Sequence, residues 1–262
     1  MPLQAQRVLN QFKYAMYFNG INAYVNIPLT VYGWPGITIQ EWIYFYKPKA
    51  NTSYSRSSMI GDRGTNSPCI QWVTDNRIDY AWIWSQFFVA TPSGTAVAYT
   101  FDISSYVNVW TNFVRRYDNS SKILSHFVNS IKANDYSIPS NYTTIFDFDP
   151  NTYTYPDRYK IFILGTNTIY TGFMTLMQYQ LLIYSRSLSD SEIQYNYQNP
   201  NNPVTNGLIV WLQADPKYIR GNTWLNLSSY GNNGTIYNAQ LIQLEKTPAR
   251  ILNANRVLGV LR

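Results

Sequence analysis

The chain has 262 residues, a formal net charge of +6 and a charged fraction of 13%, about half of the usual share. It holds one cysteine, Cys69, which excludes an internal disulfide, and it has no apolar stretch near the roughly 18 residues of a membrane-spanning helix. Lys and Arg form no dense run in the body of the chain, so we predict neither nucleic-acid binding nor a membrane span.

Short runs rich in aromatic and β-branched residues recur along the chain and are separated by Gly, Pro, Asn and Ser clusters. This pattern is typical of strands joined by turns. The expected strands are Met16–Phe18, Ala23–Ile27, Ile37–Tyr46, Ser67–Val73, Trp82–Val89, Ala96–Phe101, Thr111–Arg116, Lys122–Val128, Tyr159–Leu164, Phe173–Tyr184, Leu208–Leu212 and Gly234–Leu244. Many short strands with little helical periodicity predict an all-β sandwich.

One short helix is expected near residues 190–198. Ser189 and Glu192 form an S-x-x-E capping box, and Ile193 and Tyr197 follow at a spacing of i, i+4. The helix should end before Pro200, because proline cannot continue it.

The turn-rich segment Asn199–Asn206 is the expected boundary between a sandwich over residues 1–200 and a C-terminal β segment over residues 207–262. The final segment, Lys246–Arg262, combines four basic residues with several apolar ones and has no acid. It either covers or forms an edge of the sandwich, or it is an arm that contacts a neighbouring subunit. The candidate assembly residues are Arg250, Arg256, Leu258 and Leu261.

Six motifs then follow one another in an order that resembles a known family. They are residues 16–27 (MYFNGINAYVNI), 37–43 (ITIQEWI), Trp110 with 113–114 (FV), 127–130 (FVNS), 163–165 (ILG) and 173–197, which ends in LSDSEIQYNY. In this order they resemble the motifs of laminin-G-like and concanavalin A-like domains, and the last one is the most specific. The resemblance covers residues 16–200 and implies a jelly-roll sandwich of two antiparallel sheets.

A second resemblance to the family lies after the boundary. Residues 207–212 (GLIVWL), 224–228 (WLNLS) and 231–235 (GNNGT) resemble the segment that normally precedes the first motif. Either the chain is circularly permuted and these strands complete its own sandwich, or they complete a neighbouring subunit. We favour completion within the chain, because unpaired strand edges are a liability.

The resemblance and the composition together suggest a non-catalytic surface protein. With 24 Tyr, 27 Asn and few charges, the composition is similar to that of structural proteins of archaeal viruses. Residues 1–13 contain no apolar signal core. The first hypothesis is a virion structural protein that assembles with itself or with other virion proteins and attaches to host-surface glycans. The alternatives are a stand-alone secreted lectin and a glycoside hydrolase, so the expected location is a virion surface or the extracellular space.

Catalysis is not expected. Sugar-cleaving relatives need two carboxylates about 5–10 Å apart, and the only glutamates are Glu41, Glu192 and Glu245. The E-x-D-x-x-E strand motif of such relatives is absent, and the lone histidine, His126, is expected to be an ordinary strand residue. We therefore name no catalytic residue.

Two binding sites are candidates. Trp34 stands between Gly33 and Pro35 with Tyr32 nearby, and it is either an exposed aromatic platform for a sugar or a tryptophan tucked under the sandwich. Asp147, Asp149 and Asn151 form D-x-D-x-N, which opens many calcium loops, but no glycine follows at the sixth position. This segment is either a loose calcium site or a solvated turn. No other cofactor is expected.

Overall fold

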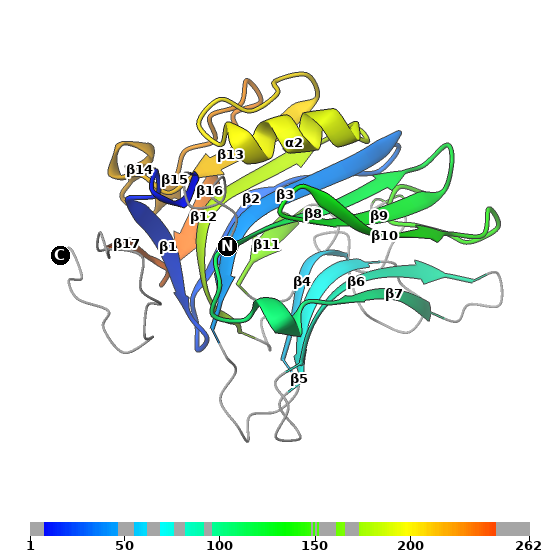
Figure 1. The fold of residues 1–262 in the computed structure, drawn as a ribbon, viewed down its shortest axis with the longest axis horizontal. Helices are drawn as coiled ribbons and strands as arrows, with labels where there is room; N and C mark the ends of the chain where they lie inside the picture. The colour runs from blue at the N-terminus through cyan, green and yellow to red at the C-terminus, as the bar shows by residue number, and fades with distance from the viewer. Residues whose placement is uncertain are drawn as a thin grey trace.

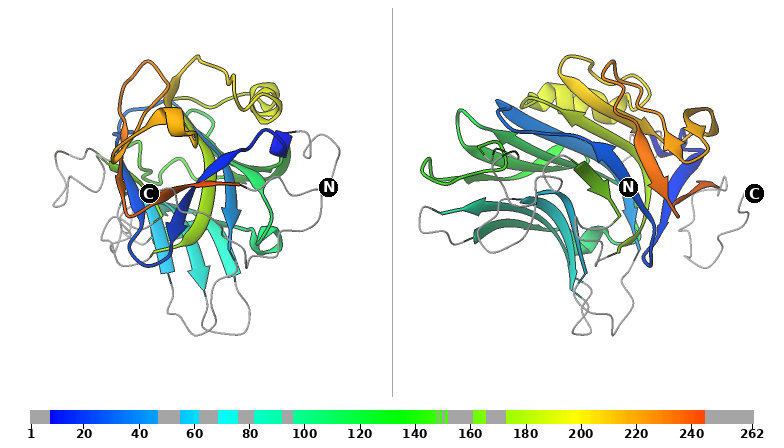
Figure 2. Two further views of the ribbon diagram at one scale, coloured as in Figure 1. Left: turned by 90° about the vertical axis from the view of Figure 1, so that its left-hand side faces the viewer. Right: turned by 180° about the vertical axis from the view of Figure 1, so that it is seen from behind.

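The structure, a computed structural model, describes residues 8–46, 55–61, 69–75, 82–91, 96–147, 149, 151, 161–165 and 173–244. Its named strands all pair antiparallel and form three sheets around a common core (Figures 1 and 2). The fold is a jelly-roll β-sandwich, as the sequence predicts. No helix among these residues is both long and apolar enough to cross a membrane.

One layer of the sandwich is a curved sheet of eight strands. Its order is β10 (Ile131–Ser137), β9 (Ile123–Val128), β8 (Thr111–Asp118), β3 (Gly36–Phe45), β12 (Thr175–Tyr184), β1 (Tyr14–Asn19) and β17 (Gln240–Gln243), and β13 (Leu208–Gln213) also pairs with β12. Every residue of the central strand β3 is buried, so this strand is covered on both faces.

The opposite layer consists of two smaller sheets, where the sequence predicts one. The first has the order β11 (Ile161–Leu164), β2 (Tyr24–Pro28), β16 (Gly234–Tyr237), β15 (Thr223–Trp224) and β14 (Ile219–Arg220). The second has the order β4 (Ser55–Gly61), β5 (Cys69–Asp75), β6 (Trp82–Ala90) and β7 (Ala96–Asp102). Strongly twisted sheets of many strands tend to divide, and the division lets this layer follow the curve of the large sheet. Val25, Phe87 and Trp224 from the two small sheets join Phe18 and Ile39 of the large one in a single core.

Helix α2 (Asp190–Gln198) covers part of the outer face of the large sheet (Figure 1). The Ser189 hydroxyl accepts a hydrogen bond from the Glu192 backbone N–H, and the Glu192 carboxylate accepts one from the Ser189 N–H. The helix ends before Pro200, so the predicted cap and end are both confirmed. Two 3₁₀ turns, η1 (Ser104–Tyr106) and η3 (Pro216–Tyr218), complete the named elements.

Strands from the C-terminal part of the chain pair with strands of the first 200 residues. β13 pairs with β12, β16 with β2, and β17 with β1. Segments that are far apart in the sequence therefore lie side by side in the fold (Figure 2).

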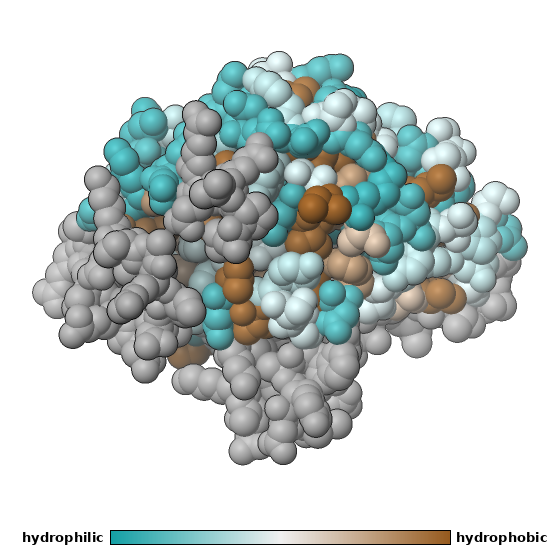
Figure 3. Space-filling model, in the orientation of Figure 1, coloured by the Kyte–Doolittle hydropathy of each residue, from teal (hydrophilic) through white to brown (hydrophobic). Residues whose placement is uncertain are grey.

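The molecular face seen in Figure 3 is largely polar over helix α2. Hydrophilic side chains cover this upper region, and the hydrophobic ones form small, separate groups below it. Exposed apolar groups of this size are normal on a folded protein and mark no broad docking face there.

Candidate functional site

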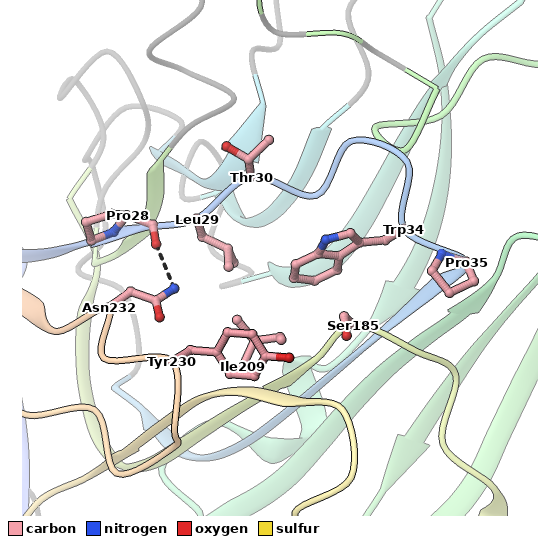
Figure 4. Close-up of a pocket in the computed structure, with 9 residues that line it drawn as sticks. All are labelled: Pro28, Leu29, Thr30, Trp34, Pro35, Ser185, Ile209, Tyr230 and Asn232. Atoms are coloured by element: carbon pink, nitrogen blue, oxygen red, sulfur yellow. Dashed lines mark hydrogen bonds between the residues drawn. The ribbon is translucent and has the colours of Figure 1, made fainter.

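A groove of about 620 Å³ lies where four distant segments of the chain meet (Figure 4). The first segment joins β2 to β3, the second follows β12, the third is β13, and the fourth is the loop that joins β15 to β16. The groove is open to solvent and is lined by Pro28, Leu29, Thr30, Trp34, Pro35, Ser185, Ile209, Tyr230 and Asn232.

Trp34 forms one side of the groove. Its loop is anchored by the buried side chains of Leu29 and Val31, which are 5% and 2% exposed. The Trp34 N–H donates to the Val31 carbonyl at 3.1 Å, and Gly33 has a φ of +75°, which turns the chain between the two anchors. Trp34 is thus held half-buried, with part of its ring facing the groove.

Tyr32, the other predicted sugar-binding residue, is 48% exposed but is not among the residues that line the groove.

Tyr230 and Asn232 stand on the opposite side, where Tyr230 is 61% exposed (Figure 4). The Asn232 Nδ2 donates to the Pro28 carbonyl at 3.0 Å and so ties this loop to the end of β2. Between the two sides, Leu29 and Ile209 give the groove an apolar lining.

Asn226 organises the loop that carries Tyr230. Its Oδ1 accepts from the Trp211 and Ser228 N–H groups at 2.8 and 3.0 Å, and its Nδ2 donates to the Ile209 carbonyl at 2.9 Å. The Ser228 hydroxyl also donates to the Ile209 carbonyl, at 2.6 Å, and accepts from the Tyr230 N–H at 3.3 Å. Side-chain bonds of this kind fix a loop that has little regular structure. The Tyr230 side chain therefore projects from an ordered loop.

None of the nine lining residues is charged. The neighbouring Arg186 forms two hydrogen bonds to Glu192, at 3.0 and 2.6 Å, and its Nε donates to the Asn206 carbonyl. The bond to Arg186 is the main cause that lowers the pKa of the Glu192 carboxyl to about 2. This ion pair supports the helix cap and leaves the groove neutral.

Glu41, one of the three glutamates considered for hydrolysis, lies in the core. Its side chain is 1% exposed, pairs with Arg115 and accepts from the Gln178 Nε2 at 3.2 Å. Glu192 serves the helix cap, and Glu245 lies outside the described residues. None of the described residues that line the groove carries a carboxylate. The described residues therefore place no pair of glutamates where two could act on a sugar.

His126 is a strand residue, as predicted, because it lies within β9 and is 2% exposed. Its Nδ1 lies 3.0 Å from the Asn134 Oδ1, and Phe101 stacks on its ring. Burial lowers its pKa to about 4; the hydrogen bond with Asn134 opposes this shift, and the nearby charge of Arg115 adds a smaller lowering effect. It is a neutral core residue at pH 7.

The predicted calcium residues are engaged in local turns. The Asp147 Oδ2 accepts from the N–H and hydroxyl of Thr144 at 2.9 and 2.8 Å, and the Asp149 Oδ1 accepts from the Asn151 N–H at 2.9 Å. Within the described ranges, no three His, Cys, Asp or Glu side chains gather as metal ligands. The calcium site stays a prediction, which a rise in melting temperature on calcium addition, lost in Asp149→Ala, would support.

The four predicted assembly residues, Arg250, Arg256, Leu258 and Leu261, lie outside the described residues.

Sequence reasoning identified Trp34 from its Gly and Pro neighbours but missed Tyr230, Asn232, Ser185 and Ile209. Asn232 and Ser185 belong to motifs that the family resemblance covers, yet nothing in those motifs indicates a groove. Tyr230 is one of 24 tyrosines, and only the pairing of β13 and β16 with the rest of the fold brings it opposite Trp34.

Comparison with known proteins gives similarity in structure only. No protein-family model matches the sequence, and no curated protein matches it. A candidate carbohydrate-binding protein from Bacteroides ovatus superimposes with a TM-score of 0.58 at 14% identity over 89% of this chain, which spans 60% of that protein's length. A heptameric SAP-like pentraxin from Limulus polyphemus has a TM-score of 0.45 at 9% identity and covers 71% of this chain and 82% of its own. The binding domain of botulinum neurotoxin DC, solved with SialylT, has a TM-score of 0.49 at 11% identity over 72% of this chain and 43% of its own. At these identities the likeness shows the fold alone.

Proposed function

We propose that this protein binds carbohydrate in the groove between Trp34 and Tyr230. The observation that carries the proposal is the pair of aromatic side chains, held by separate loops on two sides of one open groove. An aromatic ring offers a large apolar face with little conformational freedom, which suits the C–H face of a sugar. Ser185 and Asn232 add the few polar groups that orient a ligand in an otherwise apolar site.

The Bacteroides ovatus protein supports the proposal, since it shares the fold and is itself a candidate carbohydrate-binding protein. One fold hosts many functions, so function is argued from the site itself. The arrangement of the groove in this chain is therefore the stronger ground.

A glycan array with the purified protein tests the proposal, followed by titration of the best ligand. Trp34→Ala and Tyr230→Ala should each weaken binding about tenfold or more, because each removes one wall. Tyr195→Ala is the matched control: Tyr195 is a 41% exposed tyrosine on helix α2 and does not line the groove. Equal loss in all three variants, or no loss in the first two, would contradict the proposal.

In its wider form, the proposal is that this non-catalytic protein lies on a particle or cell surface, where it both self-associates and attaches to glycans. The low-charge, Tyr- and Asn-rich composition is the ground for the particle, and a free-standing extracellular lectin is the alternative. Light scattering from pH 3 to 7 separates them, since a defined oligomer favours the particle component and a monomer at every pH favours the lectin.

The C-terminal segment provides a second test of assembly. Deleting residues 246–262, with their Arg250, Arg256, Leu258 and Leu261, should weaken self-association more than it lowers the melting temperature. The reverse result would make this segment part of the domain core instead.

A further inference from the structure

We infer that the groove selects an uncharged sugar residue, held between Trp34 and Tyr230, and rejects acidic sugars such as sialic and uronic acids. This inference rests on the proposed function and adds the chemical class of the ligand. It follows from the charge of the walls, from the engagement of the neighbouring charges and from the hydrogen-bonding groups that remain.

The described residues of the walls supply no counter-charge for an anion. All nine lining residues are neutral, and the apolar lining of Leu29 and Ile209 offers no hydrogen bond through its side chains. A carboxylate that entered here would lose part of its hydration without gaining a cation, and an unpaired charge is costly to desolvate. A neutral sugar ring loses far less hydration free energy on entering the groove.

Two charged residues beside the lining segments, Arg186 and Asp118, are engaged elsewhere. Arg186 follows Ser185 directly, but its guanidinium is held by Glu192 and by the Asn206 carbonyl. Turning it toward the groove would leave Glu192 without its cation and would weaken the helix cap.

Asp118 lies on the other side, paired in register with Gly36 next to Pro35. Its Oδ1 accepts from the N–H and hydroxyl groups of Ser120 and Ser121 at 2.6–3.1 Å, which holds its carboxylate within its own turn.

The remaining polar groups suit hydroxyl or acetamido substituents. Among the described residues, the hydroxyls of Ser185 and Tyr230 and the Trp34 indole N–H make no hydrogen bond to the protein. Asn232 uses one amide N–H on the Pro28 carbonyl and retains the other. These groups donate and accept without charge, so they pair with neutral sugar substituents.

The test is titration with three sets of ligands: neutral hexosides, N-acetylhexosaminides, and matched glycans that end in sialic or glucuronic acid. At least one uncharged set should bind, and the acidic set should bind at least about tenfold more weakly, which corresponds to 1.4 kcal/mol. Because no ion pair forms, the affinity should change less than about twofold between low and high salt.

Ser185→Lys supplies the missing cation and provides a gain-of-function check. It should strengthen binding of the acidic set and make that binding salt-dependent, whereas Ser185→Asn, which adds size without charge, should give the acidic set no such gain. Circular dichroism and the melting temperature verify that both variants are folded.

The outcomes separate the inference from the proposed function. Strong binding of acidic glycans that is lost in Trp34→Ala overturns the inference and leaves the function standing. If Trp34→Ala and Tyr230→Ala leave the binding of both acidic and uncharged glycans unaffected, the groove is not the binding site. The inference about its selectivity is then also overturned. Failure of every glycan to bind the folded protein overturns both.

Discussion

The buried pair of Glu41 and Arg115 gives the sharpest prediction. Both side chains are almost fully buried, at 1% and 2% exposure, on adjacent strands β3 and β8. Replacing Glu41 by Gln keeps the shape of the side chain but leaves the Arg115 guanidinium in the core without its carboxylate. Breaking a buried pair in this way costs about 3–5 kcal/mol. Since a domain is stable by only about 5–15 kcal/mol in total, Glu41→Gln should remove a large share of the stability.

Urea unfolding followed by tryptophan fluorescence measures this loss. The matched control is Asp190→Asn, because Asp190 pairs with Arg116 and Lys132 but is 59% exposed, so it should cost less than about 1 kcal/mol. The double variant Glu41→Leu with Arg115→Met should regain much of the loss, because an apolar pair replaces both charges.

A cost for Glu41→Gln no larger than that of Asp190→Asn would refute this reasoning. The carboxylate would then not be required for the fold, and a chemical role for Glu41 would have to be considered again.

Two other predictions follow from the same structure. Ser189→Ala removes the hydroxyl that accepts from the Glu192 N–H at 3.2 Å, so it should cost about 1 kcal/mol in urea unfolding, whereas Ser189→Asp should retain most of the cap; an equal loss in both would contradict the capping role. The imidazole of His126 has a pKa near 6.5 in the unfolded chain but about 4 in the fold. The contribution of the neutral imidazole to the free energy of unfolding is therefore complete above pH 6.5 and is lost as the pH falls toward 4. At about 1.4 kcal/mol per pKa unit the loss is about 3 kcal/mol, and His126→Gln should show a correspondingly weaker dependence on pH over this range; an identical slope in both proteins would refute it.

The sequence predicts those parts of the fold that depend on local pattern. The capping box at Ser189 and Glu192, followed by the apolar Ile193, marks the start of a helix, and β3 is rich in the β-branched and aromatic residues that favour a buried strand. Strand β10 escapes prediction because its sequence, IKANDYS, lacks apolar alternation. It exists as an exposed edge strand through its pairing with β9.

The side of the candidate site that contains Tyr230 could not be predicted from the sequence, for a physical reason. Gly33 and Pro35 mark the loop of Trp34 locally, but no local signal separates Tyr230 from the other tyrosines. Its position depends on the pairing of β16 with β2, and so on contacts between residues about 200 positions apart. Such contacts are set by the whole fold, so no window of sequence contains them.

The same structure explains why the groove depends on neutral chemistry. Of the glutamates in the described residues, Glu41 joins two strands through Arg115, and Glu192 holds a helix through Arg186. Both charges stabilise the framework, and neither lines the groove. The chain has few acids to begin with, so its exposed site is left with aromatic rings, hydroxyls and amides. These groups can hold a ligand by stacking and hydrogen bonding, but they offer no carboxylate pair to cleave it. The proposed binding role therefore rests on where the described charges are placed as much as on the groove itself.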